Sequence, residues 1–217
     1  MSKATPRKKY EQLILKGIGN ADKHWRKWTQ GDWLDTAPEY LLSVEIAQSI
    51  GATEPVWLEV SAGGVMVESA AKQAGKHHAI LDGLKRFDVV IYERSKPLPR
   101  AVVEVKHRVY GRLGNLQKDM KRICVALLKA KRQRLKYRAQ EEAARSSLMY
   151  GFLAYYTSTS VPKNTDPSAL ARIDRWIDAE TMHIQKAYPA VKTSSSRKVL
   201  RSVNGECAAA IVISIMA

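Results

Sequence analysis

Cysteine is scarce in this chain, and its scarcity narrows the ways in which the fold can be held together. Cys124 and Cys207 are the two cysteines among 217 residues, too few for a disulfide framework, so stability must come from an apolar core. Both lie next to apolar residues, and we expect them to be buried thiols in a reducing compartment.

Long apolar stretches are also missing, which argues against a membrane protein. The longest such stretch, residues 208–217, is too short to span a bilayer. The N-terminal residues MSKATPRKKYEQ are basic and lack the apolar segment of a secretion signal. We therefore expect a cytoplasmic protein, with no membrane as its partner.

Acidic residues are few relative to basic ones, and this imbalance indicates the kind of partner. The chain has 36 Lys and Arg against 21 Asp and Glu, which gives a formal charge of +15. Such a surface attracts polyanions, because each phosphate that it neutralises releases counterions. Nucleic acid is the leading candidate, with an anionic membrane surface as the weaker alternative. The length and a hydrophobic content of 45% favour one globular domain.

The segment between residues 86 and 111 holds the side chains that bear on chemistry. Two runs rich in β-branched residues flank a charged segment with two prolines, which predicts a strand, a turn and a second strand. Side chains alternate along a strand, so Glu104 and Lys106 should point the same way. Asp88 opens the neighbouring strand, and a hairpin would bring it beside this pair.

Two carboxylates and one ammonium at the end of a sheet can serve as a site for a divalent ion and a water that cuts a phosphodiester. The Glu-x-Lys spacing alone is weak, because a chain of this composition should contain about one such tripeptide by chance. The alternative is an ordinary exposed strand end that carries an ion pair. The placement of Glu104 and Lys106 after an apolar run, with Asp88 on the preceding strand, favours the site.

The rest of the pattern predicts an α/β domain with a mixed sheet and helices on its faces. Helical spacing after an early proline predicts a helix over residues 38–50, with Glu39 in its first turn. A strand at 56–60 should be followed by a turn at 61–64; the pattern of residues 65–80 is ambiguous, and 65–67 could continue a hairpin. The other predicted elements are a helix from residue 116 with a basic extension at 129–138, a strand at 148–156, a polar loop at 157–167, a helix at 169–188, a basic serine-rich loop at 189–206 that could close over a bound strand, and a strand covered on both faces at 209–215.

Residues 1–35 form a basic segment that contains Trp25, Trp28 and Trp33. Tryptophans among lysines can stack on nucleic-acid bases. They more often anchor a terminal segment to a core, and we favour that interpretation for this segment.

Residues 38–156 resemble the PD-(D/E)XK nuclease superfamily, whose restriction-endonuclease-like fold has an αβββαβ core. The run RFDVV, residues 86–90, is similar to the aspartate strand of that family, with Phe87 where proline is frequent. The run AVVEVK, residues 101–106, is similar to its Glu-x-Lys strand. The resemblance implies a single nuclease-like domain that consists of an N-terminal extension at 1–35, a core at 36–156, and a C-terminal helix and strand at 157–217 that complete the sheet.

The resemblance also implies a role for individual residues. Asp88 and Glu104 would bind Mg²⁺, with Mn²⁺ as a substitute, and the Val105 carbonyl would be a third ligand. Glu39 would reach the same ion directly or through water, and Lys106 would orient the attacking water. Candidates on the next helix for supporting the site or contacting nucleic acid are Gln117, Lys118 and Lys121.

The expected activity is therefore that of a metal-dependent endonuclease or exonuclease, with DNA favoured over RNA. The first alternative is a catalytically inactive nucleic-acid-binding module of the same fold, and the presence of Asp88, Glu104 and Lys106 together argues against it. The second is an adaptor whose basic surface binds a membrane or an acidic protein. Because cutting both strands of a duplex often takes two sites, a homodimer is a reasonable hypothesis.

Overall fold

The computed structural model describes residues 5–69, 81, 85–96, 98–107, 109, 116–136, 148–160, 169–203 and 206–217. The strands in these ranges form one mixed six-stranded sheet in the order β1-β2-β3-β4-β6-β5. β3 and β4 run parallel, and the other neighbours are antiparallel. The strands are β1 (Val56–Ser61), β2 (Arg86–Tyr92), β3 (Pro99–Lys106), β4 (Tyr150–Ser160), β5 (Lys192–Val203) and β6 (Glu206–Met216).

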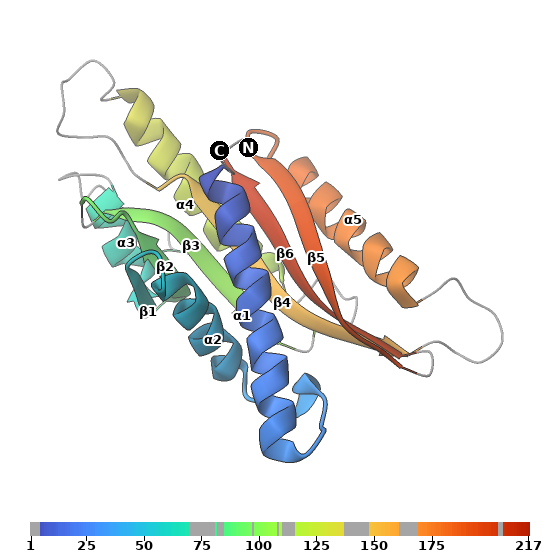
Figure 1. The fold of residues 1–217 in the computed structure, drawn as a ribbon. Helices are drawn as coiled ribbons and strands as arrows, with labels where there is room; N and C mark the ends of the chain where they lie inside the picture. The colour runs from blue at the N-terminus through green and yellow to red at the C-terminus, as the bar shows by residue number, and fades with distance from the viewer. Residues whose placement is uncertain are drawn as a thin grey trace.

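Helices cover both faces of this sheet, as Figure 1 shows, so the protein is of the α/β class. One layer contains α1 (Pro6–Thr29), the short 3₁₀-helix η1 (Leu34–Thr36) and α2 (Glu39–Gly51), and the other contains α3 (Ala62–Ser69), α4 (Gln117–Lys136) and α5 (Ala169–Ala187). Each layer packs on its own apolar core. Among the described residues, no helix is long and apolar enough to cross a membrane.

The alternation of side chains along β3 separates the two cores. Val103 and Val105 pack in the layer of α1 and α2, whereas Val102 packs in the layer of α4. Glu104 and Lys106 form ion pairs with residues of α4. The prediction that these two side chains share a face is therefore confirmed.

The N-terminal segment forms a long helix that is built into the core. α1 buries Ile14 and Ile18 completely beside the sheet. Trp25 and Trp33 are partly buried against the same core, as the anchoring interpretation expected. Trp28 is different, since 62% of it is exposed.

Several other predictions are confirmed. The hairpin of β2 and β3 is antiparallel, and the helices expected at 38–50 and 169–188 appear as α2 and α5. The strand at the C-terminal end is buried between two layers, with alternate residues of β6 in each core. Both cysteines are buried. In order, α2, β1, β2, β3, α4 and β4 follow one another as expected for residues 38–156, with α3 added between β1 and β2.

The predicted turn at 61–64 and hairpin through 65–67 are wrong, because this segment is the helix α3. Ala62, Val65 and Met66 are buried at helical spacing and pack as one apolar face. The two glycines between them suggested a turn, but packing against the sheet outweighs that local preference.

The predicted loop at 189–206 is also wrong. Most of it is β5, which pairs with β6 along its whole length at the edge of the sheet. Serine, lysine and arginine are poor strand formers alone, but the apolar partner strand supplies the hydrogen bonds and the packing. The loop expected at 157–167 fails in its first part for the same reason, because residues 157–160 continue β4 against β6.

Candidate active site

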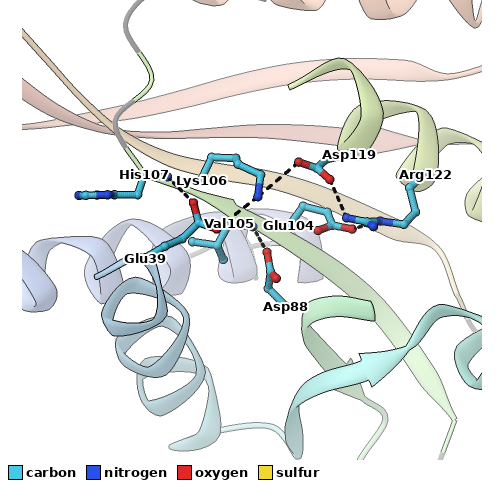
Figure 2. Close-up of polar contacts among 8 residues, drawn as sticks. All are labelled: Glu39, Asp88, Glu104, Val105, Lys106, His107, Asp119 and Arg122. Atoms are coloured by element: carbon cyan, nitrogen blue, oxygen red, sulfur yellow. Dashed lines mark hydrogen bonds and ion pairs between the residues drawn. The ribbon is translucent and has the colours of Figure 1, made fainter. Parts of the chain in front are cut away.

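The hairpin of β2 and β3 brings the predicted site residues together, as Figure 2 shows. Asp88 lies on β2, and Glu104, Val105 and Lys106 lie at the end of β3. The backbone N–H of Val105 donates a hydrogen bond to Asp88 Oδ2 at 2.6 Å. This bond fixes the Asp88 carboxylate between the two strands.

The backbone is irregular around Asp88. Phe87 and Val89 flank it and both pair with β1, yet their side chains lie in opposite core layers, which regular alternation does not allow. Glu59 stands opposite on β1 with a left-handed φ of 54°. Positive φ is uncommon for residues other than glycine, and such strain is often found at functional sites.

Glu104 is the most deeply buried charged residue of the site. Its side chain has no exposed surface, and Oε1 accepts a hydrogen bond from Arg122 Nε of α4 at 2.5 Å. Its other oxygen, Oε2, is buried without a hydrogen-bond partner among the described residues. Burial raises the pKa of Glu104 well above its ordinary value, although Arg122 opposes the rise.

Lys106 lies between two carboxylates from different helices. Its Nζ is 3.3 Å from Glu39 Oε1 of α2 and 3.5 Å from Asp119 Oδ2 of α4. Burial by itself lowers the pKa of Lys106. The nearby carboxylates Asp119, Glu39 and Asp88 together raise it by more, so the net pKa is above the ordinary value. Lys106 is therefore a fixed ammonium and not a proton acceptor at neutral pH.

Glu39 joins the start of α2 to the end of β3. Its Oε2 accepts the backbone N–H of His107 at 3.1 Å, while Oε1 contacts Lys106. The ring of His107 in turn contacts the carbonyl oxygen of Leu34 through Nε2 at 2.6 Å. The expected glutamate is thus at the site, where it contacts Lys106 at the end of β3 and His107 directly after it.

The charges of this cluster do not balance. Four carboxylates lie around two cations, so full ionisation leaves an excess of two negative charges, three of the carboxylates being at least partly buried and Glu39 exposed. Burial raises the pKa of Asp88 to about 6; the Val105 N–H and Lys106 oppose the rise, and Glu39 and Glu59 add to it. Buried charge that lacks a partner is costly. The carboxylates are Glu39, Asp88, Glu104 and Asp119, and the cations are Lys106 and Arg122.

Two members of the cluster, Asp119 and Arg122, were not among the residues predicted from the sequence. Arg122 Nη2 contacts Asp119 Oδ1 at 2.6 Å, one helical turn away. Both residues lie beside the buried apolar residues of α4, which include Met120, Ile123 and Cys124. Their position next to this apolar face was the feature of the sequence that could have identified them. The predicted residues Gln117, Lys118 and Lys121 are exposed on the same helix.

The donor set suits a hard divalent ion only in part. Within the described ranges, no group of three or more His, Cys, Asp or Glu side chains is arranged to hold a metal. Mg²⁺, however, takes one or two carboxylates and keeps several waters. Asp88 and Glu104 are two such carboxylates, and Glu104 Oε2 is a buried acceptor without a hydrogen-bond partner among the described residues.

Comparisons with known proteins assign no family to this chain. No family model matches the chain, and neither the curated proteins nor the solved structures contain a match. The fold and the cluster around Glu104 are therefore the basis for assigning a function.

Proposed function

We propose that this protein is a metal-dependent nuclease that hydrolyses phosphodiester bonds, with DNA as the favoured substrate and RNA as the less favoured one. The observation that carries the proposal is the excess of carboxylates around the buried Glu104 at the end of β3. Glu104 has no exposed surface and one oxygen without a partner, and four carboxylates there face two cations. A divalent cation would supply the missing positive charge.

Asp88 and Glu104 would hold Mg²⁺, or Mn²⁺ as a substitute, with the Val105 carbonyl as a third ligand. The Val105 N–H bond to Asp88 would keep one carboxylate oxygen turned to the strand and fix its orientation. A bound divalent ion would supply positive charge for the scissile phosphate and favour loss of a proton from the attacking water.

The other residues of the cluster would position charge around the phosphate. Lys106 is held by Glu39 and Asp119 and remains protonated, so it would orient the water and offset phosphate charge. Glu39 would keep the end of β3 and the ammonium in place. Asp119 and Arg122 would fix the Lys106 and Glu104 side chains from the side of α4.

The nucleic acid would reach the site along the exposed side of α4. Gln117, Lys118 and Lys121 are exposed within one turn of Asp119, where cations can contact phosphates. The formal charge of +15 favours such a partner whatever its sequence. We further propose a cytoplasmic protein that cuts duplex DNA as a homodimer.

The test is cleavage of single-stranded, duplex and branched DNA, with RNA in parallel, in Mg²⁺, in Mn²⁺ and in EDTA. Asp88→Asn should abolish metal-dependent cleavage, and Lys106→Ala should lower it by about 100- to 1000-fold, while DNA binding remains in both. Asp174→Asn and Lys186→Ala make the same chemical changes on α5 and should cleave normally. Cleavage that survives in both site variants would refute the proposal that Asp88 and Lys106 belong to a nuclease active site.

One observation favours a second function, a nucleic-acid-binding module without catalysis. Arg122 already places a cation 2.5 Å from Glu104, where the nuclease needs a metal. This alternative predicts DNA binding that EDTA does not change and no heat of Mg²⁺ binding in calorimetry. Saturable Mg²⁺ binding that Asp88→Asn removes would eliminate it.

A further inference from the structure

A pocket with polar and aromatic walls lies on β1 and β2, on the same side of the sheet as Glu104. Its volume is about 530 Å³, enough for one aromatic ligand. Trp57 and Tyr92 form its aromatic part, and Glu68 lies between the sheet and solvent on α3. Arg94 and Lys96 contribute cations from the turn after β2.

Trp57 leaves most of its apolar ring in contact with water, which is unfavourable for an apolar group. It lies on the edge strand β1, and 63% of its surface is accessible. It meets Tyr92 edge to face, with ring centroids 6.5 Å apart and an angle of 70° between the planes. A second aromatic ring that stacked on Trp57 would bury this surface and complete the cluster.

Glu68 gives the pocket a fixed hydrogen-bond acceptor. Its Oε2 accepts a hydrogen bond from the Tyr92 hydroxyl at 2.9 Å. Burial raises the pKa of Tyr92, and Glu68 raises it further, so the hydroxyl keeps its proton and remains the donor. A carboxylate can accept about four hydrogen bonds, so Glu68 can take more donors from a ligand.

The charges around the ring match a nucleotide. Arg94 and Lys96 can contact phosphates, while Glu68 needs a ligand that brings N–H donors. A purely anionic ligand would be repelled by Glu68 and by Glu93, which also lines the pocket. A base with an amino group, joined to a phosphate, satisfies the ring, the acceptor and the cations together.

We infer that this pocket binds one base of single-stranded DNA and favours bases with an exocyclic amino group over thymine. The base stacks on Trp57, and its amino group donates to Glu68, as carboxylates accept from cytosine N4 in duplex recognition. Arg94 and Lys96 contact the adjoining phosphates. Thymine has no amino donor, and its one N–H, at N3, lies between two carbonyl oxygens that the Glu68 carboxylate repels.

The pocket and the candidate active site lie on the same side of the sheet. Tyr92 follows Asp88 by four residues on β2, a separation of about 13 Å along the strand. Val90, which pairs with Trp57, lies in the same core layer as Tyr92. A bound base would therefore fix a DNA strand a few nucleotides from the site. This inference takes its ligand class from the proposed function, but binding in the pocket needs neither metal nor cleavage.

The test measures dissociation constants of short fluorescent oligo-dC and oligo-dT in EDTA. Wild type should bind oligo-dC about fivefold more tightly than oligo-dT. Trp57→Ala should weaken binding of oligo-dC about tenfold or more. Trp28→Ala removes a ring that is 62% exposed on α1 and should bind within twofold of wild type.

Glu68→Gln separates recognition of the base from folding. This variant should keep its melting temperature, show a smaller preference for oligo-dC, because an amide oxygen is a weaker acceptor than a carboxylate, and bind oligo-dT as wild type does. Equal binding of the two oligonucleotides by wild type, or wild-type affinity in Trp57→Ala, would refute the inference that the pocket binds a base, even if the protein cleaves DNA. Loss of binding in Trp57→Ala without any metal-dependent cleavage would support the pocket and refute the nuclease.

Discussion

Arg122 Nε donates a hydrogen bond to Glu104 Oε1 at 2.5 Å, and Glu104 is fully buried on the strand that ends at Lys106. The arginine compensates one oxygen of the carboxylate and leaves the other without a partner among the described residues. Glu104 is therefore either half of a permanent ion pair or a metal ligand held ready by an arginine. The two proposed functions differ on this point.

Replacing Arg122 should expose the cost of the buried carboxylate. Arg122→Met leaves Glu104 without a cation, and we expect the free energy of unfolding in EDTA to fall by about 3 kcal/mol. If a metal binds at Glu104, saturating Mg²⁺ should stabilise this variant more than it stabilises wild type. Urea denaturation with and without Mg²⁺ measures both quantities.

Arg197→Met is the matched control, because Arg197 pairs with Asp174 where both side chains are partly exposed. Such surface pairs contribute about 1 kcal/mol or less. An equal loss of stability in the two variants would show that Arg122 is not compensating a buried charge.

Lys106 and Glu39 should differ in their effect on cleavage. Lys106→Ala removes a charge next to the phosphate and should lower kcat by about 100- to 1000-fold. Glu39→Gln disturbs the residue that holds Lys106 and the His107 N–H, so a smaller loss of about 10- to 100-fold is expected. Single-turnover cleavage at saturating Mg²⁺ gives the rate of each variant relative to wild type. A larger loss for Glu39→Gln than for Lys106→Ala would indicate that Glu39 is itself a ligand of the metal.

Glu180 should make stability depend on pH. It is buried on α5 and accepts the Tyr155 hydroxyl at 2.5 Å, and burial raises its pKa from 4.5 to about 7. The folded protein therefore holds this proton more tightly than the unfolded chain does. The stabilisation is complete below pH 4.5 and is lost as pH rises to about 7.

The variant Glu180→Gln cannot ionise and isolates this contribution. Relative to wild type, it should gain about 3 kcal/mol between pH 4.5 and pH 8. Denaturant unfolding of both proteins across that range provides the comparison. A difference between them that does not change with pH would mean that Glu180 is already ionised in the fold.

Gly17 should be essential where α1 crosses α2. A Cβ at this position would lie 2.5 Å from Ile46 Cα and 2.8 Å from Ile46 N, and backbone atoms cannot move aside cheaply. Gly17→Ala should therefore destabilise the protein by about 2 kcal/mol or more. Gly19→Ala, two residues along the same helix, would meet only side-chain ends at 3.5 Å and 3.6 Å and should gain up to about 1 kcal/mol. Thermal unfolding of the pair measures the contrast.

The core of the candidate site was predictable because it depends on local patterns. The alternation of β3 alone places Glu104 and Lys106 on one face, and the antiparallel pairing of β2 and β3 brings Asp88 next to Val105. Glu39 could be placed in the first turn of its helix from the proline before it. Each of these steps involves residues whose relationship is set by strand or helix periodicity.

The contacts of Asp119 and Arg122 could not be predicted from strand or helix periodicity. The helix from residue 116 was predicted, but the sequence does not say which residue beside its buried face meets Glu104. That depends on how α4 is rotated over the sheet, which the packing of both core layers decides. The exposed positions Gln117, Lys118 and Lys121 looked equally suitable before this rotation was known.

The sequence by itself determined the α/β class, the hairpin that carries Asp88 and Glu104, and the basic charge. Periodicity and composition are sufficient for these features, since each is encoded within a short segment or in the chain as a whole. Only the tertiary structure decided that residues 192–203 form an edge strand, that α3 follows β1, and that Arg122 compensates Glu104. Each of these depends on contacts between distant segments, and such contacts overrule weak local preferences when they bury apolar surface or pair a buried charge.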